Sequence, residues 1–430
     1  MTESKPKSFY GTKLVFFLLF IYAVQMGFAL YSRSVIYPFM LEELPWTRAQ
    51  IMLGHTGSSM LFGFASPVVA YLINRYNAKL SITLGAAIII VTNTLMGLFG
   101  DSYPIYMALS IANGLGLCMS SLLPTQTIVI SWFQSRRAMA LGVVLGGGSI
   151  GGFIFPQVVT RIIEAGGEVW QLGWYVCALA SLVVLILNLI LVKNKPEDIG
   201  QYPDGLSPEQ RKEMEENGKN KRKTVYRSEA DWTLKDALRS RALWLIILAG
   251  AGNLFLWHIM QSQGPFHLQD RGFEPAFASF LYSLAIGSSI FGRFTVAAIG
   301  DYVETRYLYA AGILCILLGG IAFWFASPEM LWIAYFYPIM AGIGFGTAFL
   351  CRSLVISNYF GAKSFATISG FATPIGSLIT AFAPPLAGLF YDLTSTYLYI
   401  LIFGWLFAAV AIFASLLLYP PKHPEEKAIE

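Results

Sequence analysis

The 430-residue sequence predicts an all-α membrane protein with twelve transmembrane helices in two six-helix bundles. Three observations support this prediction. Hydrophobic residues make up 56% of the chain and charged residues only 13%, whereas soluble proteins carry about 25% charged residues. Uncharged runs of about 20 residues, long enough to cross about 30 Å of hydrocarbon, recur along the chain. A polar stretch divides these runs into two groups of six. The composition therefore excludes a soluble enzyme.

Each of the twelve apolar segments is long enough to form a membrane-spanning helix. Their approximate bounds are 13–40, 49–74, 79–100, 103–133, 137–163, 169–193, 241–264, 275–300, 306–327, 330–360, 364–391 and 394–418. No cleavage site of small residues follows the first segment, so we expect a retained span rather than a removed signal peptide. The expected units are an N-terminal bundle, a cytoplasmic linker, a C-terminal bundle and a cytoplasmic tail, over 1–193, 194–240, 241–418 and 419–430.

The stretch between the two groups, 193–241, carries 12 Lys/Arg and 10 Asp/Glu. Its composition is typical of a solvated linker, in which we expect one amphipathic helix near Trp232 to Ala237. Most Lys/Arg of the short loops fall on one side of the predicted membrane, which places both termini and the linker in the cytoplasm. Because the basic residues are spread over loops, the net charge of +4 does not indicate a nucleic-acid partner.

The two halves repeat one another at an offset of 227 or 228 residues. The matching pairs include Lys13 and Arg241, Asn74 and Asp301, Lys79 and Arg306, Gly116 and Gly344, and Phe133 and Phe360. A repeat of six spans implies two similar bundles with a substrate site between them near the membrane midplane. This is the architecture of an alternating-access transporter.

Buried cations are the most informative feature of the predicted spans. Arg33, Arg293 and Arg352 fall within spans, whereas all 25 Asp/Glu fall in loops, in tails or at the ends of helices. An arginine at the bilayer centre costs at least about 2.5 kcal/mol unless it faces a wet cavity or a partner. A transported anion can be that partner, and the planar fork of arginine suits a carboxylate. The alternative is that each arginine snorkels or donates to backbone carbonyls.

Two of these arginines lie at similar depth. Arg293 stands eight residues before Asp301, and Arg352 eleven residues before Lys363, so both lie about 12 to 16 Å inside the cytoplasmic boundary at 1.5 Å per residue. We expect them to reach one ligand. Arg33 lies near the outer end of the first span, and we interpret it as an access or gating charge.

Polar residues on the seventh span add further candidates. Asn253, Trp257 and Gln261 share one helix face at i, i+4 spacing and are expected to line the substrate cavity. His258, beside them, and His55 are candidate proton carriers, although a lone histidine in a helix is more often a packed, hydrogen-bonding residue. At the cytoplasmic ends of spans eight and nine, Asp301 and Arg306 are candidates for gating.

The sequence gives little support for nucleotide binding, metal binding or catalysis. Gly146, Gly148 and Gly151 spell G-x-G-x-x-G, but no strand precedes them, and no P-loop motif occurs. The four cysteines lack metal-ligand spacing, and no pair of titratable groups is placed for acid–base work within the bilayer. We therefore expect no enzyme activity, no cofactor and no metal. Transport must then draw its energy from gradients.

Several motifs resemble the major facilitator superfamily, and within it the monocarboxylate transporter family and its bacterial relatives, which include oxalate/formate antiporters. The junction of spans four and five is similar over Trp132, Phe133, Arg136, Arg137, Ala140, Gly142 and Gly147. Arg293, followed by Gly300 and Asp301, resembles the span-eight arginine that binds the substrate carboxylate in the family. Arg33 looks like the basic residue at the outer end of span one. The similarity runs through nearly the whole chain.

The chain also departs from the family pattern. Animal members carry an Asp, a proton partner, where this chain has Ser289. The motif Gly-x-x-x-Asp-Arg-x-Gly of the loop between spans two and three is reduced here to Ala70, Asn74, Arg75 and Asn77. Arg352 is an addition to the monocarboxylate pattern and favours a dianion or a bulkier acid.

We therefore expect a secondary active transporter of the cell membrane, in a bacterial inner membrane. It is predicted to move a small monocarboxylate such as lactate or pyruvate by alternating access with proton symport. One alternative is a dicarboxylate antiporter of the oxalate/formate type in which Arg293 and Arg352 form a cation pair. Another is a transporter-like receptor that does not translocate. The expected partners are a carboxylate, protons and the lipid bilayer, with the protein a monomer.

Overall fold

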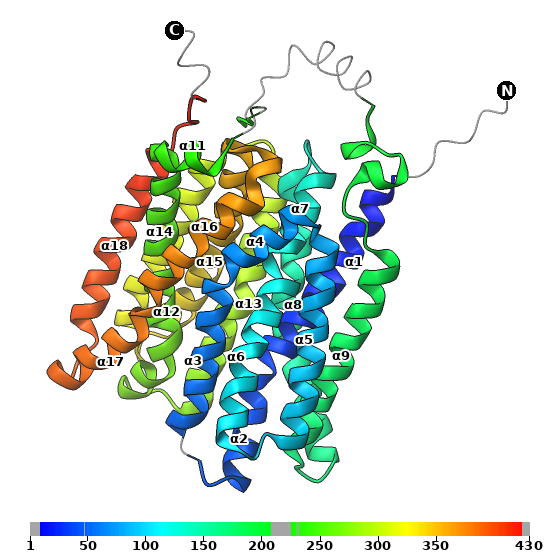
Figure 1. Cartoon of the computed structure of the whole chain (residues 1–430). Coiled ribbons are helices and arrows are strands. Elements are labelled where there is room, and N and C mark those ends of the chain that lie inside the picture. Colours follow the sequence, from blue (N-terminus) through cyan, green and yellow to red (C-terminus); the bar gives the residue numbers. More distant parts are fainter. Residues whose placement is uncertain (1–8, 47, 208–224, 229, 231, 424–430) are drawn as a thin grey trace. The chain divides into compact units, whose positions relative to one another are not determined.

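The structure is a computed structural model and describes residues 9–46, 48–207, 225–228, 230 and 232–423. Every regular element within these residues is a helix (Figure 1). The first half contains α1 (Tyr10–Val24), the π-helix η1 (Gln25–Tyr31), α2 (Arg33–Glu43), α3 (Arg48–Phe64), α4 (Ser66–Arg75), α5 (Ala78–Phe99), α6 (Tyr103–Ser120), α7 (Leu122–Trp132), α8 (Arg137–Ala165) and α9 (Trp170–Leu191). After the short helices η2 (Pro196–Ile199), η3 (Pro203–Gly205) and α11 (Leu234–Arg239), the second half contains α12 (Arg241–Asp270), α13 (Pro275–Ile299), α14 (Thr305–Phe325), α15 (Leu331–Tyr359), α16 (Gly361–Ala381), α17 (Ala383–Thr394) and α18 (Leu398–Leu416).

The described helices have the length and composition of membrane spans. Eleven are long and apolar enough to cross a bilayer, and Leu53–Phe64 with Ser66–Arg75, a pair bent by 44°, makes a twelfth if counted as one span. Large apolar side chains such as Trp332 and Phe413 are about two-thirds exposed, as expected where lipid covers the surface. The predicted all-α membrane fold is confirmed.

The first span changes its helical pitch just before Arg33. The Ser32 backbone N–H donates to the Gly27 carbonyl at 2.9 Å, the five-residue spacing of a π-helix. Gly27 permits a close approach to α8, because a Cβ at this position would lie 2.6 Å from the Gly151 carbonyl oxygen. Single π-turns inside α-helices frequently mark functional sites.

Prolines interrupt three of the predicted spans. The break between α3 and α4 is followed by Pro67, the break at Ser121 by Pro124, and the break at Phe382 by Pro384. Proline has no backbone N–H and its ring clashes with the preceding turn, so the helical ladder cannot continue undisturbed. Neighbouring helices can satisfy the freed backbone groups within a membrane.

The chain forms two compact units, each described here by itself. One comprises Met1–His55 and Tyr71–Thr224, and the other comprises Thr56–Ala70 and Val225–Glu430. Parts of α3 and α4 therefore belong with the second half of the chain, and a Cβ at Gly370 would lie 2.5 Å from that of Ala70.

Equivalent helices pack in the same way within the two units. The pairs α1 with α8, α5 with α9 and α5 with α6 match the pairs α12 with α16, α14 with α18 and α14 with α15. A Cβ at Gly85 would lie 2.6 Å from the Gly116 carbonyl oxygen, and one at Gly344 would lie 2.5 Å from that of Gly312. Small residues thus allow close backbone packing at corresponding places of the repeat.

Both described ends of the linker contact the short connections between helices. The Asp204 carboxylate accepts hydrogen bonds from the backbone N–H groups of Gln134 and Ser135, at 3.1 and 2.8 Å. Trp232 packs edge-on against Phe360, with ring centres 5.1 Å apart. The helix α11 lies where the sequence predicted one. The middle of the linker, 208–224, is outside the described residues.

Candidate functional site

Arg293 lies where α13 and α15 pack most closely. A Cβ at Gly346 of α15 would lie 2.0 Å from the Ser289 carbonyl oxygen on α13, so only glycine permits this approach. The Arg293 side chain is 6% exposed. Its guanidinium carbon lies 5.7 Å from the centre of the Phe349 ring on α15, a cation–π arrangement that stabilises the charge. The helix contact therefore determines where the guanidinium lies.

One face of α15 is partly exposed. Throughout 344–360, all of which the structure describes, the partly exposed residues are Phe345, Phe349 and Arg352, and the others are buried. Their spacing of four and three residues places them on one side of the helix. Phe345 also stacks on Trp257 of α12, with ring centres 4.3 Å apart and planes 6° from parallel. Together, α12, α13 and α15 thus surround a row of aromatic rings.

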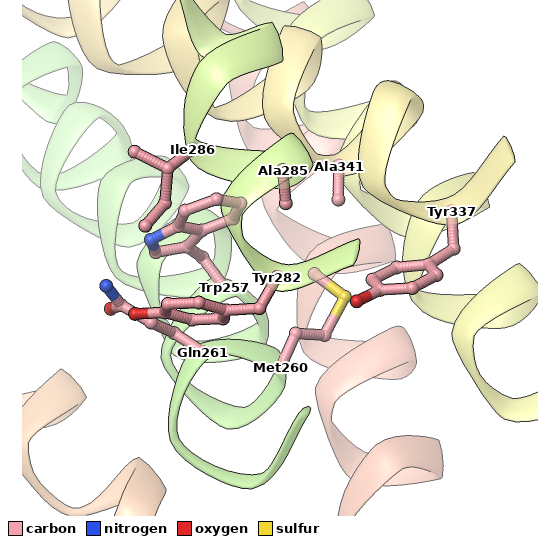
Figure 2. A pocket seen from close by; sticks show the side chains of 8 residues that line it. All are labelled: Trp257, Met260, Gln261, Tyr282, Ala285, Ile286, Tyr337 and Ala341. Carbon is pink, nitrogen blue, oxygen red and sulfur yellow. The ribbon is translucent and has the colours of Figure 1, made fainter. Parts of the chain in front are cut away.

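A small pocket lies beside this row within the second unit. Figure 2 shows its side chains gathered around one space: Trp257, Met260, Gln261, Tyr282, Ala285, Ile286, Tyr337 and Ala341. Tyr282 and Ile286 share a face of α13 with Ser289 and Arg293, because the spacings are four, three and four residues. The arginine and the pocket are therefore on the same side of α13.

Arg352 lies among three further helices. Its Nη2 donates to the Thr373 hydroxyl on α16 at 3.5 Å. Its Cδ and the Tyr309 hydroxyl of α14 both lie within 3.4 Å of the place a Cβ would occupy on Gly250 of α12. The buried Tyr309 oxygen has no hydrogen-bond partner among the described residues. Arg352 thus belongs to a polar group at the level of Gly250, one turn of α12 before Asn253.

Asn253 itself is buried, with 2% of its surface exposed. Its amide oxygen makes no hydrogen bond to any group in the part of the chain that the structure describes. Trp257 and Gln261, the next two residues on the predicted stripe, line the pocket. The stripe therefore runs from the surroundings of Arg352 to the pocket.

Arg33 belongs to the first unit and is held by neutral polar groups. The guanidinium donates to the Asn113 amide oxygen, and the side chain is 2% exposed. The Asn113 amide nitrogen donates in turn to Thr92 at 3.0 Å and to Asn93 at 2.6 Å. Buried hydrogen-bond networks of this kind orient each member.

Two tyrosines complete the surroundings of Arg33. Tyr37 lies one turn after Arg33 and hydrogen-bonds with it and with Tyr106. The Tyr106 hydroxyl donates to the Ile51 carbonyl at 2.7 Å. His55 lies nearby, with its ring 6.3 Å from that of Tyr37. His55 therefore neighbours Arg33, whereas His258 lies in the other unit.

His258 hydrogen-bonds with the backbone of Thr380 on α16. Pro384 lies four residues after Thr380 and has no N–H to donate to that carbonyl. The histidine ring thus supports the backbone at the end of α16, immediately before the break at Phe382. This contact links α12 to the interrupted span.

The two candidate gating residues lie at the ends of helices. Asp301, after α13, forms an ion pair of 2.9 Å with Arg227 of the linker. Arg306, at the start of α14, donates to the Tyr307 hydroxyl at 2.9 Å and lies over the Tyr419 ring at 4.4 Å. Asp301 is thus bound to the linker, and Arg306 to its own helix and to the segment that follows α18.

The sequence interpretation named Trp257 but missed the other aromatic residues of the site. The face formed by Tyr282, Ile286, Ser289 and Arg293 could have been found from its helical spacing. Phe345 and Phe349 were hidden among many apolar residues of their span. On sequence alone, nothing distinguishes a ring on the partly exposed face from one in the packed core.

The helical spans and the buried cations within them define a multi-pass membrane protein of the transporter class. Residues 15–384 match the Major Facilitator Superfamily, and the chain belongs to that family. Its fold is similar to that of XylE, a proton:xylose symporter, with a TM-score of 0.73 at 14% identity, covering 97% of this chain and 99% of that one. For FucP, the Escherichia coli fucose:proton symporter, the TM-score is 0.70 at 14% identity, over 95% and 98% of the two chains.

Sequence relatives include transporters of several kinds. Human monocarboxylate transporter 2 is 25% identical over 88% of this chain and 78% of its own. The gentisate transporter of Corynebacterium glutamicum is 26% identical over 80% of this chain and 74% of its own. Similarity to the fujikurins efflux protein of Gibberella fujikuroi covers only 39% of this chain and 34% of that protein, at 26% identity.

Proposed function

We propose that this protein is a secondary active transporter of a small monocarboxylate, with Arg293 as the group that binds the carboxylate. One observation supports the proposal most directly: α13 carries a buried guanidinium, that of Arg293. The predicted spans have Asp/Glu only at the ends of their helices, so they offer this cation no carboxylate. A charge-assisted, two-pronged contact with a carboxylate is the strongest interaction open to such a group. Two relatives named for monocarboxylates and for gentisate, both carboxylates, support the same substrate class.

Several finer features belong to this proposal. The protein is a monomer in a bacterial inner membrane, with both termini in the cytoplasm. Alternating access carries the substrate across, and a proton moves with it. No chemical conversion accompanies transport.

A dicarboxylate antiporter is the second candidate. Arg352 favours it, because a second guanidinium lies on the partly exposed face of α15, three residues after the ring that contacts Arg293. Two cations would suit two carboxylates of one substrate.

Uptake of labelled lactate, pyruvate and oxalate into proteoliposomes tests these functions. Symport predicts monocarboxylate uptake that rises with an inward proton gradient and disappears in Arg293→Gln. Antiport predicts rapid oxalate exchange with preloaded anion and no response to the gradient. A protein that accumulates none of these acids under either condition would contradict both.

A further inference from the structure

The second unit contains a continuous row of aromatic rings that ends at the arginine. We define the aromatic row as Trp257, Phe345 and Phe349. Adjacent ring centres are 4.3 Å apart for Trp257 and Phe345 and 5.5 Å apart for Phe345 and Phe349. The Arg293 guanidinium carbon lies 5.7 Å from the Phe349 ring. A ligand whose carboxylate contacts Arg293 therefore meets aromatic surface directly beside its charged end.

Two of the three rings of the row are partly accessible, whereas Trp257 is buried. Phe345 and Phe349 are partly exposed, as is Arg352, on a stretch of α15 whose other residues are buried. Beside the row, a small pocket is lined mainly by apolar and aromatic side chains, with Tyr282 on α13 and Tyr337 on α15.

A short hydroxy acid or keto acid would make poor use of this surface. Its hydroxyl or keto group needs a hydrogen-bond partner, and a group removed from water without one is destabilising. The two phenylalanine rings offer none, and the indole N–H of Trp257 is the one donor of the row. An aromatic ring, in contrast, gains from offset or edge-on contact with other rings beyond the area that it buries.

We infer that the transported monocarboxylate is aromatic: its carboxylate binds Arg293 and its ring packs against Phe349 and Phe345. This inference rests on the proposed function, since it takes Arg293 to be the carboxylate site. It goes further in naming the substrate class, which Arg293 alone leaves open. The aromatic row selects for the ring of the substrate, and the guanidinium selects for its negative charge.

Competition between matched acids tests the inference. Benzoate and cyclohexanecarboxylate have the same carboxylate and nearly the same size, but only benzoate has an aromatic ring. We expect benzoate to inhibit labelled benzoate uptake at least tenfold more strongly than cyclohexanecarboxylate, lactate, pyruvate or oxalate. Phe349→Leu and Phe345→Leu should each raise the KM for benzoate about tenfold and remove most of the preference for it over cyclohexanecarboxylate.

Phe336→Leu is the matched control, because Phe336 is also on α15 but lies outside the aromatic row and is 37% exposed. It should keep the wild-type KM and preference, and size-exclusion profiles should show that all three variants are folded. If cyclohexanecarboxylate competes as well as benzoate while uptake still requires Arg293, the aromatic class is wrong and the proposed function stands. If no acid shows Arg293-dependent uptake, the proposed function is wrong as well.

Discussion

The guanidinium of Arg293 can be tested for shape as well as for charge. Arg293→Lys keeps a positive charge but replaces the planar fork by a point charge that cannot bind both carboxylate oxygens in parallel. The shorter reach of its ammonium group also loses the Phe349 contact. We expect transport to fall at least tenfold in the Lys variant and to vanish in Arg293→Gln, while both proteins fold. Initial uptake rates in proteoliposomes provide the measurement, and wild-type rates in the Gln variant would overturn the assignment.

Proton coupling is a second question at the scale of single residues. With Ser289 in place of an acid, the groups left to carry a proton are His258, His55 and the substrate itself. Histidine titrates near neutral pH, so we expect uptake stimulated by an inward proton gradient. His258→Gln should lose most of this stimulation and keep gradient-independent exchange, since glutamine can still donate to the Thr380 carbonyl.

The control is His55→Gln, whose ring lies in the other unit near Tyr37 and Arg33. This variant should respond to the gradient like the wild type. Full stimulation in the double variant lacking both histidines would reject a histidine carrier.

At the scale of helices, the contact between α13 and α15 depends on glycine. A Cβ at Gly292 would lie 2.0 Å from the Ile343 carbonyl oxygen, whereas one at Gly287, also on α13, meets nothing within 4 Å. Alanine favours a helix over glycine by about 1 kcal/mol, so Gly287→Ala should keep or slightly raise the melting temperature. Gly292→Ala must separate the helices and should lower both the melting temperature and the uptake that depends on Arg293.

Melting of the purified proteins in detergent compares the two substitutions directly. Equal melting temperatures and equal uptake would show that α15 can move away at little cost. In that case the close packing would not be what positions Arg293.

The end of α12 provides a test of stability against pH. His267 lies beyond the apolar window Arg241–Gly264, stacked on Trp324 with ring centres 5.5 Å apart. Burial lowers the pKa of His267 to about 4, with Arg271 acting in the same direction and Asp270 opposing it. The neutral ring is therefore the folded form. Below the ordinary pKa of about 6.5 the unfolded chain takes up a proton that the folded protein does not, so stability falls as pH drops from about 6.5 towards 4.

His267→Phe keeps an aromatic ring but cannot titrate. Between pH 7 and 4.5 its melting temperature should decline less than that of the wild type, because all other titrating groups are shared. Parallel declines would show that His267 does not contribute to acid sensitivity.

For the whole molecule, the orientation in the membrane remains a prediction from the Lys/Arg bias of the loops. Cysteines introduced at Glu43 and Glu168 should react in intact cells with an impermeant thiol reagent, and one at Asp198 should react only after lysis. Three of the four native cysteines are buried, and the fourth, Cys315, is partly buried and can be replaced by serine. The reverse pattern would invert the predicted topology.

What the sequence determined about this protein was its class. Three properties of the sequence are local or periodic: its hydropathy, the repeat at 227 or 228 residues, and the arginines within apolar runs. They predicted the all-α membrane fold and identified Arg293 as a candidate. The resemblance around Trp132 and Arg293 indicated the family to which the chain belongs.

Only the tertiary structure decided what surrounds those arginines. The Phe349 ring beside Arg293, the Asn113 amide that accepts from Arg33 and the pocket at Trp257 involve residues far apart in the chain. They meet because glycines such as Gly346 let particular helices approach to backbone contact. The breaks near Pro67 and Pro384 likewise depend on neighbours able to satisfy the freed backbone groups. Hydropathy measures whether a residue prefers lipid to water, but it does not determine which helix that residue will face.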